Sequence, residues 1–186
     1  MKRTLIVIVL IAALIAPIWA ENPYGTTPDG IDWEQIGTEI YIMSYSGTAV
    51  AIRIPERINN FPVTTIESTF SRLPNTNVTS VIIPNTVTWI KTDAFRGFTG
   101  LTSVTLGTGL TRIDSGAFWG CTALRNISIP ASVTTIGSNV FNGCSALTTV
   151  AIPTQANLTI GRNAFLGTNL DTASRTLLQG RGYSQF

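Results

Sequence analysis

Leu101-Thr-Ser-Val-Thr-Leu106 returns in the same order of residue types as Leu124-Arg-Asn-Ile-Ser-Ile129, and this repeat decides the fold. The second half of the unit repeats as well. Ile113-Asp-Ser-Gly-Ala-Phe-Trp-Gly-Cys121 returns at the same spacing as Ile136-Gly-Ser-Asn-Val-Phe-Asn-Gly-Cys144. A fixed period of this length is typical of a solenoid, in which each unit forms one coil. One coil buries little apolar surface alone, so we expect the coils to stack around a shared core.

The unit recurs along most of the chain. Regular units begin at Val78, Leu101, Leu124 and Leu147, always at the same spacing, and an irregular first unit begins at Val50. The pattern ends near residue 170. We therefore predict an α/β solenoid of about five 23-residue coils over residues 50–170.

Each coil has three recognisable parts. In the third unit, Val104 and Leu106 alternate with a threonine, which is typical of a short strand with one buried face. Four residues separate Ile113 from Phe118, which suits one helical turn, and Gly120 then fits a left-handed exit. Stacking should also gather one phenylalanine from each coil into a buried column: Phe95, Phe118, Phe141 and Phe165.

Residues 1–20 are expected to be a signal peptide. Lys2 and Arg3 precede an apolar run over residues 5–16, and Ala20 provides a small residue at the cleavage point. The run is shorter than the roughly 20 residues that a membrane span needs. Its removal takes away two of the 12 basic residues, leaving 10 against 10 acidic ones. The mature chain is then near neutral, which gives no argument for a nucleic-acid partner.

Segments outside the repeat are expected to cap the solenoid, because open ends would expose its core. Residues 21–49 are divided into a mobile lead-in rich in Pro, Gly and Thr, over residues 21–30, and a β-hairpin that turns at Gly37. Residues 171–186 are predicted to form a second cap. Its helix begins at Asp171 or Thr172 and stops at Gly180, and a tail follows.

The composition argues against catalysis. The chain has no histidine, which removes the usual general base and the commonest metal ligand. Two cysteines cannot provide the four ligands of a structural zinc site. We therefore predict no enzyme activity, no metal and no cofactor.

Binding residues are sought among side chains that point outward. The outward positions of the strands, with a neighbouring position, are Arg53, Ile82, Thr105, Ser128 and Asn126. A solvated sheet face without a ligand is the alternative, because these residues are small and lack the aromatic anchors common in binding hot spots. Trp89 belongs to a second outward column with Arg112, Thr135 and Thr159, and either marks an interface or packs on a neighbouring coil. The same two readings apply to Trp119, with Arg96 or Asn142 as its packing partner.

Cys121 and Cys144 occupy the same place in adjacent coils. Stacked strands lie roughly 5 Å apart, within the Cα separation of about 4.4–6.8 Å that a disulfide needs. The alternative is a pair of buried thiols that behave as small apolar side chains.

The unit in residues 124–146 resembles the leucine-rich repeat of the BspA-like bacterial surface-protein family, through its pattern Leu-x-x-Ile-x-Ile-Pro, Val-x-x-Ile-Gly and Phe-x-x-Cys. Three residues depart from it: Phe98 and Thr168 stand at a cysteine position, and Gly107 stands at a proline position. The resemblance implies an exported protein, secreted or at the cell surface, with the periplasm as another compartment. It also implies an adhesin that binds extracellular-matrix or bacterial surface proteins. The alternative is a structural, self-associating surface component.

Overall fold

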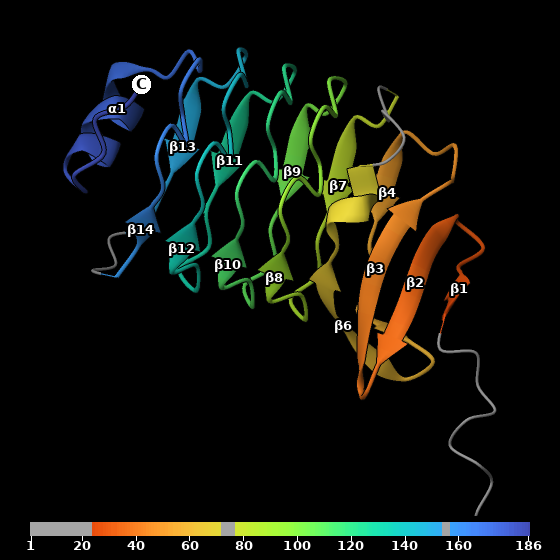
Figure 1. Ribbon diagram of the computed structural model, residues 1–186. Coiled ribbons are helices and arrows are strands. Elements are labelled where there is room, and N and C mark those ends of the chain that lie inside the picture. The colour runs from red at the N-terminus through yellow and green to blue at the C-terminus, as the bar shows by residue number, and fades with distance from the viewer. Residues whose placement is uncertain (1–23, 72–76, 154–156) are drawn as a thin grey trace, which may run out of the picture.

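The computed structural model describes residues 24–71, 77–153 and 157–186. The expected signal peptide, residues 1–20, and its cleavage point lie outside the described residues. The described chain forms a nearly straight stack of coils, with one α-helix at the C-terminal end and a β-hairpin at the N-terminal end (Figure 1). The predicted solenoid with its two caps is therefore confirmed.

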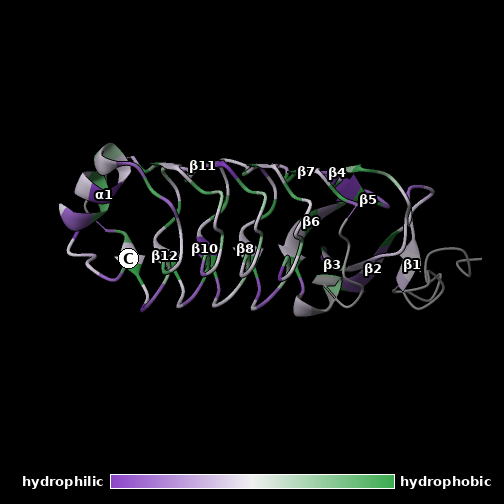
Figure 2. Ribbon diagram, turned by 90° about the horizontal axis from the view of Figure 1, so that it is seen from above, coloured by the Kyte–Doolittle hydropathy of each residue, from purple (hydrophilic) through white to green (hydrophobic). Residues whose placement is uncertain are grey.

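Two rows of short parallel strands run along opposite sides of the stack (Figure 2). The first row consists of β4 (Ala51–Arg53), β7 (Ser80–Ile82), β9 (Ser103–Thr105), β11 (Asn126–Ser128) and β13 (Thr149–Ala151). The second row consists of β6 (Phe61–Ile66), β8 (Trp89–Ile90), β10 (Arg112–Ile113), β12 (Thr135–Ile136) and β14 (Thr159–Ile160). Pairing within the second row is continuous, whereas the first row is divided into a β4-β7-β9 sheet and a β11-β13 sheet.

The N-terminal cap extends only the second row. Its hairpin consists of β2 (Ile31–Ile36) and β3 (Glu39–Tyr45), joined at Gly37, whose φ of +64° suits a glycine. Strand β3 then pairs in parallel with β6, so cap and coils share one sheet. The prediction of a mobile lead-in over residues 21–30 is wrong for β1 (Tyr24–Thr26), which pairs with β2. A short strand, β5 (Arg57–Ile58), pairs with β6, and a 3₁₀ turn, η1 (Ser68–Ser71), follows.

A column of aromatic rings forms the centre of the core. The predicted phenylalanines stack with centroid separations between 5.1 and 5.5 Å, and all are fully buried. The column continues beyond them at both ends. Phe70 and Tyr45 extend it into the N-terminal cap, and Tyr183 and Phe186 extend it into the C-terminal segment. The caps therefore bury the two faces of the core that stacking alone would expose.

The prediction of a helical turn before each phenylalanine is wrong. In each regular coil this segment is a tight turn. It follows the isoleucine that ends the second-row strand, which we call the column isoleucine, and the third residue after that isoleucine has a positive φ. The residues at this position are Asp93 (57°), Gly116 (68°), Asn139 (57°) and Asn163 (56°). Gly, Asn and Asp are the residues that tolerate this left-handed conformation, which interrupts an α-helix. The predicted left-handed glycine exit is confirmed in four coils, with φ between 71° and 75° at Gly97, Gly120, Gly143 and Gly167.

The C-terminal cap is α1 (Thr172–Gln179) together with the residues after it. Asp171 caps the helix, as predicted, because its side chain accepts a hydrogen bond of 2.7 Å from the Ser174 amide. That bond lowers the pKa of Asp171. The predicted tail is part of the cap, since buried Tyr183 packs edge to face against Phe165 and its hydroxyl accepts a bond of 2.9 Å from the Phe165 amide. Among the described residues, no helix is long and apolar enough to cross a membrane.

Candidate binding surfaces

The outward strand positions do lie side by side on the first row. Arg53, Ile82 and Thr105 are aligned across β4, β7 and β9. Asn126 and Ser128 belong to β11, in the separate β11-β13 sheet. All of these residues are exposed except Ile82, which is half-buried. The first-row face is thus a preformed surface, but only Arg53 contributes a charge from its strands.

Trp89 lies on β8 in the second row, on the opposite side of the stack from the first-row face (Figure 2). The structure therefore does not bring Trp89 together with the other predicted binding residues. Its expected column is confirmed, since Trp89, Arg112, Thr135 and Thr159 are aligned from coil to coil. These residues are half-buried or exposed, as an outward column requires.

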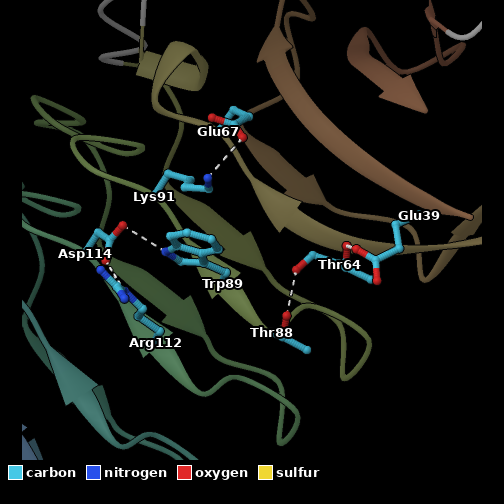
Figure 3. Close-up of polar contacts among 8 residues, drawn as sticks. All are labelled: Glu39, Thr64, Glu67, Thr88, Trp89, Lys91, Arg112 and Asp114. Atoms are coloured by element: carbon cyan, nitrogen blue, oxygen red, sulfur yellow. Dashed lines mark hydrogen bonds and ion pairs between the residues drawn. The ribbon is translucent and has the colours of Figure 1, made fainter. Parts of the chain in front are cut away.

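A group of charged side chains surrounds the Trp89 ring (Figure 3). The indole Nε1 donates a hydrogen bond of 2.8 Å to Asp114 Oδ2, and Arg112 Nε donates one of 2.5 Å to Asp114 Oδ1. Lys91 Nζ lies 3.7 Å from the ring centroid and 3.7 Å from Glu67 Oε1. The Arg112 guanidinium carbon is 5.0 Å from the same ring. We call Glu67, Trp89, Lys91, Arg112 and Asp114 the Trp89 cluster.

Hydrogen bonds and cation–π contacts fix the rotamers within the Trp89 cluster. The Asp114 carboxylate uses both oxygens, and its side chain is only 12% exposed, so it acts as the internal anchor. Arg112 is 54% exposed and presents its remaining donors to solvent. The cluster therefore offers an indole and a guanidinium, two groups common in binding hot spots, on an ordered surface.

Sequence reasoning placed Trp89 and Arg112 in one column but missed the other three charged residues of the cluster. Glu67, Lys91 and Asp114 each follow the column isoleucine of their coil, so they stack as acid, base and acid. This alternation at nearly fixed spacing was the available signal. Only the stacking shows that Asp114 reaches back to the ring of the preceding coil.

Trp119 forms a second aromatic–cation contact. Its ring is 36% exposed, and the Arg96 guanidinium carbon lies 4.1 Å from its centroid. Arg96 also pairs with Asp93 at 3.4 Å. Trp89 and Trp119 therefore both pack on a neighbouring coil, which was one of the two roles expected for each tryptophan.

Cys121 and Cys144 are fully buried free thiols, and the disulfide considered from the sequence is not formed in the structure. Cys121 Sγ donates to the Phe95 carbonyl at 3.3 Å, and Cys144 Sγ donates to that of Phe118 at 3.1 Å. The neighbouring Cys144 thiol and burial raise the pKa of Cys121 well above its ordinary value. Within the described part of the chain, no three His, Cys, Asp or Glu side chains gather as metal ligands would.

Comparison with known families decides the identity of the repeat. The family described as the BspA type leucine rich repeat region matches residues 64–176 in six copies. The chain belongs to this BspA-type leucine-rich repeat family. The matched region begins within β6, in the first coil, and ends within the C-terminal cap helix.

Several solved structures share the fold of this chain. A leucine-rich repeat protein from Bacteroides capillosus is 28% identical, with a TM-score of 0.63 over 70% of this chain and 99% of that one. A leucine rich cell surface protein from Faecalibacterium prausnitzii is 26% identical, with a TM-score of 0.59 over 79% of this chain and 47% of that one. The pneumococcal vaccine antigen PcpA, at 20% identity, shares the fold with a TM-score of 0.66 over 81% of this chain and 43% of that one. This chain thus spans less than half of the latter two, and no curated protein matches it.

Proposed function

We propose that this protein is an exported, non-catalytic binding module of adhesin type that recognises a surface protein of a host or of another bacterium. The observation that carries the proposal is the Trp89 cluster. It presents an aromatic ring and a guanidinium that are already held by Asp114, with bonds of 2.8 and 2.5 Å.

An ordered surface of this kind favours binding for a physical reason. Association costs free energy when flexible side chains must be fixed at the interface, at about 0.5–1.5 kcal/mol for each long side chain. In the Trp89 cluster, Arg112 and Lys91 already have intramolecular partners. Folding has therefore already fixed part of the side-chain conformation that binding would otherwise have to fix. The exposed part of Arg112 can still pair with an acidic group of the partner.

Export is the second part of the proposal. Residues 1–20 have the order of a secretory signal, and the Faecalibacterium prausnitzii relative is described as a cell surface protein. Expression of the full chain in a bacterium, followed by amino-terminal sequencing of the exported material, tests it. A sequence that begins at Glu21 supports cleavage after Ala20, whereas retention of Met1 in a cytoplasmic product contradicts it.

Binding is tested with residues 21–186 against immobilised matrix proteins, including fibronectin and fibrinogen, and against whole bacteria. The informative variant is Trp89→Thr, because threonine occupies the same column position in two later coils. Thr159→Ala is the matched control in that column. We expect Trp89→Thr to weaken saturable binding at least tenfold, as loss of a hot spot does, and the control to change it less than twofold.

A third variant separates the two surfaces. Arg53→Glu combined with Thr105→Glu alters the first-row face, which the sequence favoured, and leaves the Trp89 cluster intact. Loss of binding only in this variant would move the site to the first row and contradict the assignment to Trp89. A protein that binds none of the panel, yet assembles with rising concentration in light scattering, would instead be a self-associating surface component.

A further inference from the structure

In the described part of the chain, the first row of strands ends at the N-terminal cap in an edge that no other strand pairs with. The cap hairpin pairs through β3 with β6, which belongs to the second row. Strand β4 pairs with β7 on one side, and no strand among the described residues pairs with it on the other. The opposite end of the row is protected, because Ser174 in α1 accepts a hydrogen bond of 3.0 Å from the Val150 amide of β13. Proteins usually cover or block sheet edges, because the unpaired N–H and C=O groups of an edge strand can pair with another chain. The β4 edge is therefore a candidate site for such pairing.

The free groups on β4 follow from the hydrogen bonds between coils. Ile54 N donates to Ile82 O at 3.0 Å, and Ser80 N contacts Val50 O at 3.3 Å. In a parallel pair with this register, Ile52 bonds to β7, whereas Ala51 and Arg53 turn their N–H and C=O groups the other way. Those two residues therefore present two donors and two acceptors where the strand of a preceding coil would lie.

A hollow lies beside this edge. It has a volume of about 620 Å³ and lies between β4 and two segments of the cap, residues 28–31 and 45–49. Its floor includes Ile31, Tyr45 and Ile52, which are almost fully buried, and Arg53 lies at its rim. A single added strand would lie about 4.8 Å from β4, inside this hollow. The exposed Arg53 forms no ion pair with any described residue, so its charge is available to a ligand.

We propose that the β4 edge docks an extended segment of a partner protein as an added parallel strand. One apolar side chain of the segment lies over the floor beside Ile52, and the next residue is acidic and lies beside Arg53. Main-chain hydrogen bonds to Ala51 and Arg53 provide the affinity, as in other complexes formed by strand addition. A free peptide segment fits better than the β4 edge of a second copy, which would bring its own cap segments into the same space. This site is separate from the Trp89 cluster and goes beyond the adhesin proposal.

The repeat itself supplies the probe. A capped peptide of residues 124–130 carrying Ser128→Glu has the sequence of a first-row strand, with Ile127 equivalent to Ile52 and position 128 equivalent to Arg53. When it is docked in parallel, Ile127 directs its N–H and C=O at Ala51 and Arg53. N-methylation at Ile127 therefore removes the donor to β4, and N-methylation at position 128 is the matched control, because that amide points away.

The experiment is an NMR titration of ¹⁵N-labelled residues 21–186 with these peptides. We expect saturable shifts and slowed amide exchange at Ala51 and Arg53, about tenfold weaker binding after methylation at Ile127, and less than a twofold change after methylation at position 128. Arg53→Glu should weaken binding of the acidic peptide, and the peptide carrying Ser128→Arg should restore it. Trp89→Thr should leave peptide binding unchanged, so this test and the adhesin test can fail independently.

Three results would overturn the proposal. They are the absence of saturable binding at millimolar peptide, an equal effect of the two methylations, and shifts centred on residues other than those of β4 and the hollow. A fourth contradicting result could come from light scattering. A dimer that forms without peptide and protects the Ala51 and Arg53 amides would show that a second copy occupies the edge.

Discussion

Truncation of one ring in the aromatic column should destabilise the whole solenoid. Phe118 is fully buried between Phe95, with a centroid separation of 5.1 Å, and Phe141, at 5.5 Å. Replacing a buried phenylalanine by alanine typically costs about 3–5 kcal/mol, and each lost ring pair adds roughly 0.5–1.5 kcal/mol. The truncation cost already includes part of the ring-pair contribution, so the two energies do not simply add. We therefore expect Phe118→Ala to lower the free energy of unfolding by about 4–6 kcal/mol. For a chain of this size that corresponds to a fall in Tm of about 10–20 °C.

Urea unfolding followed by circular dichroism measures this loss, and the next residue provides the control. Trp119 is larger than Phe118 but 36% exposed, so Trp119→Ala should cost less than about 1.5 kcal/mol, mainly through its contact with Arg96. A loss below about 2 kcal/mol for Phe118→Ala, or equal losses for the two variants, would refute the column as the continuous core. Two separate transitions for Phe118→Ala would show that the coils on either side of it unfold independently.

Three further predictions concern a close approach, a helix cap and the thiols. Gly137→Ala should destabilise the protein by about 1–3 kcal/mol in thermal unfolding, because its Cβ would lie 2.5 Å from the backbone nitrogen of Ser115; an unchanged Tm would contradict this packing. Since the pKa of Asp171 is lowered from 3.8, its contribution to stability is present above that pH and is lost as the pH falls through the lower folded value. The Ser174 amide shift should therefore titrate below pH 3.8, and Asp171→Asn, which still caps, should remove that titration. Both cysteines should resist a thiol reagent at pH 8 and react as two thiols in guanidinium, whereas fewer than two in the unfolded chain would show a disulfide.

The repeat period predicted the parts of the fold that depend on stacking. Phenylalanines that recur every 23 or 24 residues, Phe95, Phe118, Phe141 and Phe165, predicted one buried column, and the rings stack in that order. The ends were harder. Tyr183 was assigned to a tail because it lies outside the period, yet its ring completes the column against Phe165. A cap has to match only one coil, so it carries no internal repeat by which it can be recognised.

The turns and the Trp89 cluster show a different limit. A four-residue spacing allows either a helical turn or a tight left-handed turn, and the choice depended on the residue type at one position, where Asp93 and Asn139 stand. That signal was present in the sequence and was missed. The bond from Trp89 to Asp114 is a case that spacing cannot predict, because it depends on the side-chain rotamers of two residues in different coils.

The uniform register between coils has a consequence for how the chain can change length. In the second row each inner coil pairs with its neighbours at equivalent positions, and the two caps contact mainly the first and last coils. In-frame duplication of one repeat-length segment would therefore add a coil without disturbing either terminus, and deletion of one such segment would remove a coil. Loss or gain of a single codon within a strand would instead shift its apolar residues out of their columns. Between strands one extra residue is accommodated, since Ile160 follows Ile136 by 24 residues and still pairs with it. Gene variants that change the strands of such arrays should accordingly differ by whole multiples of the repeat.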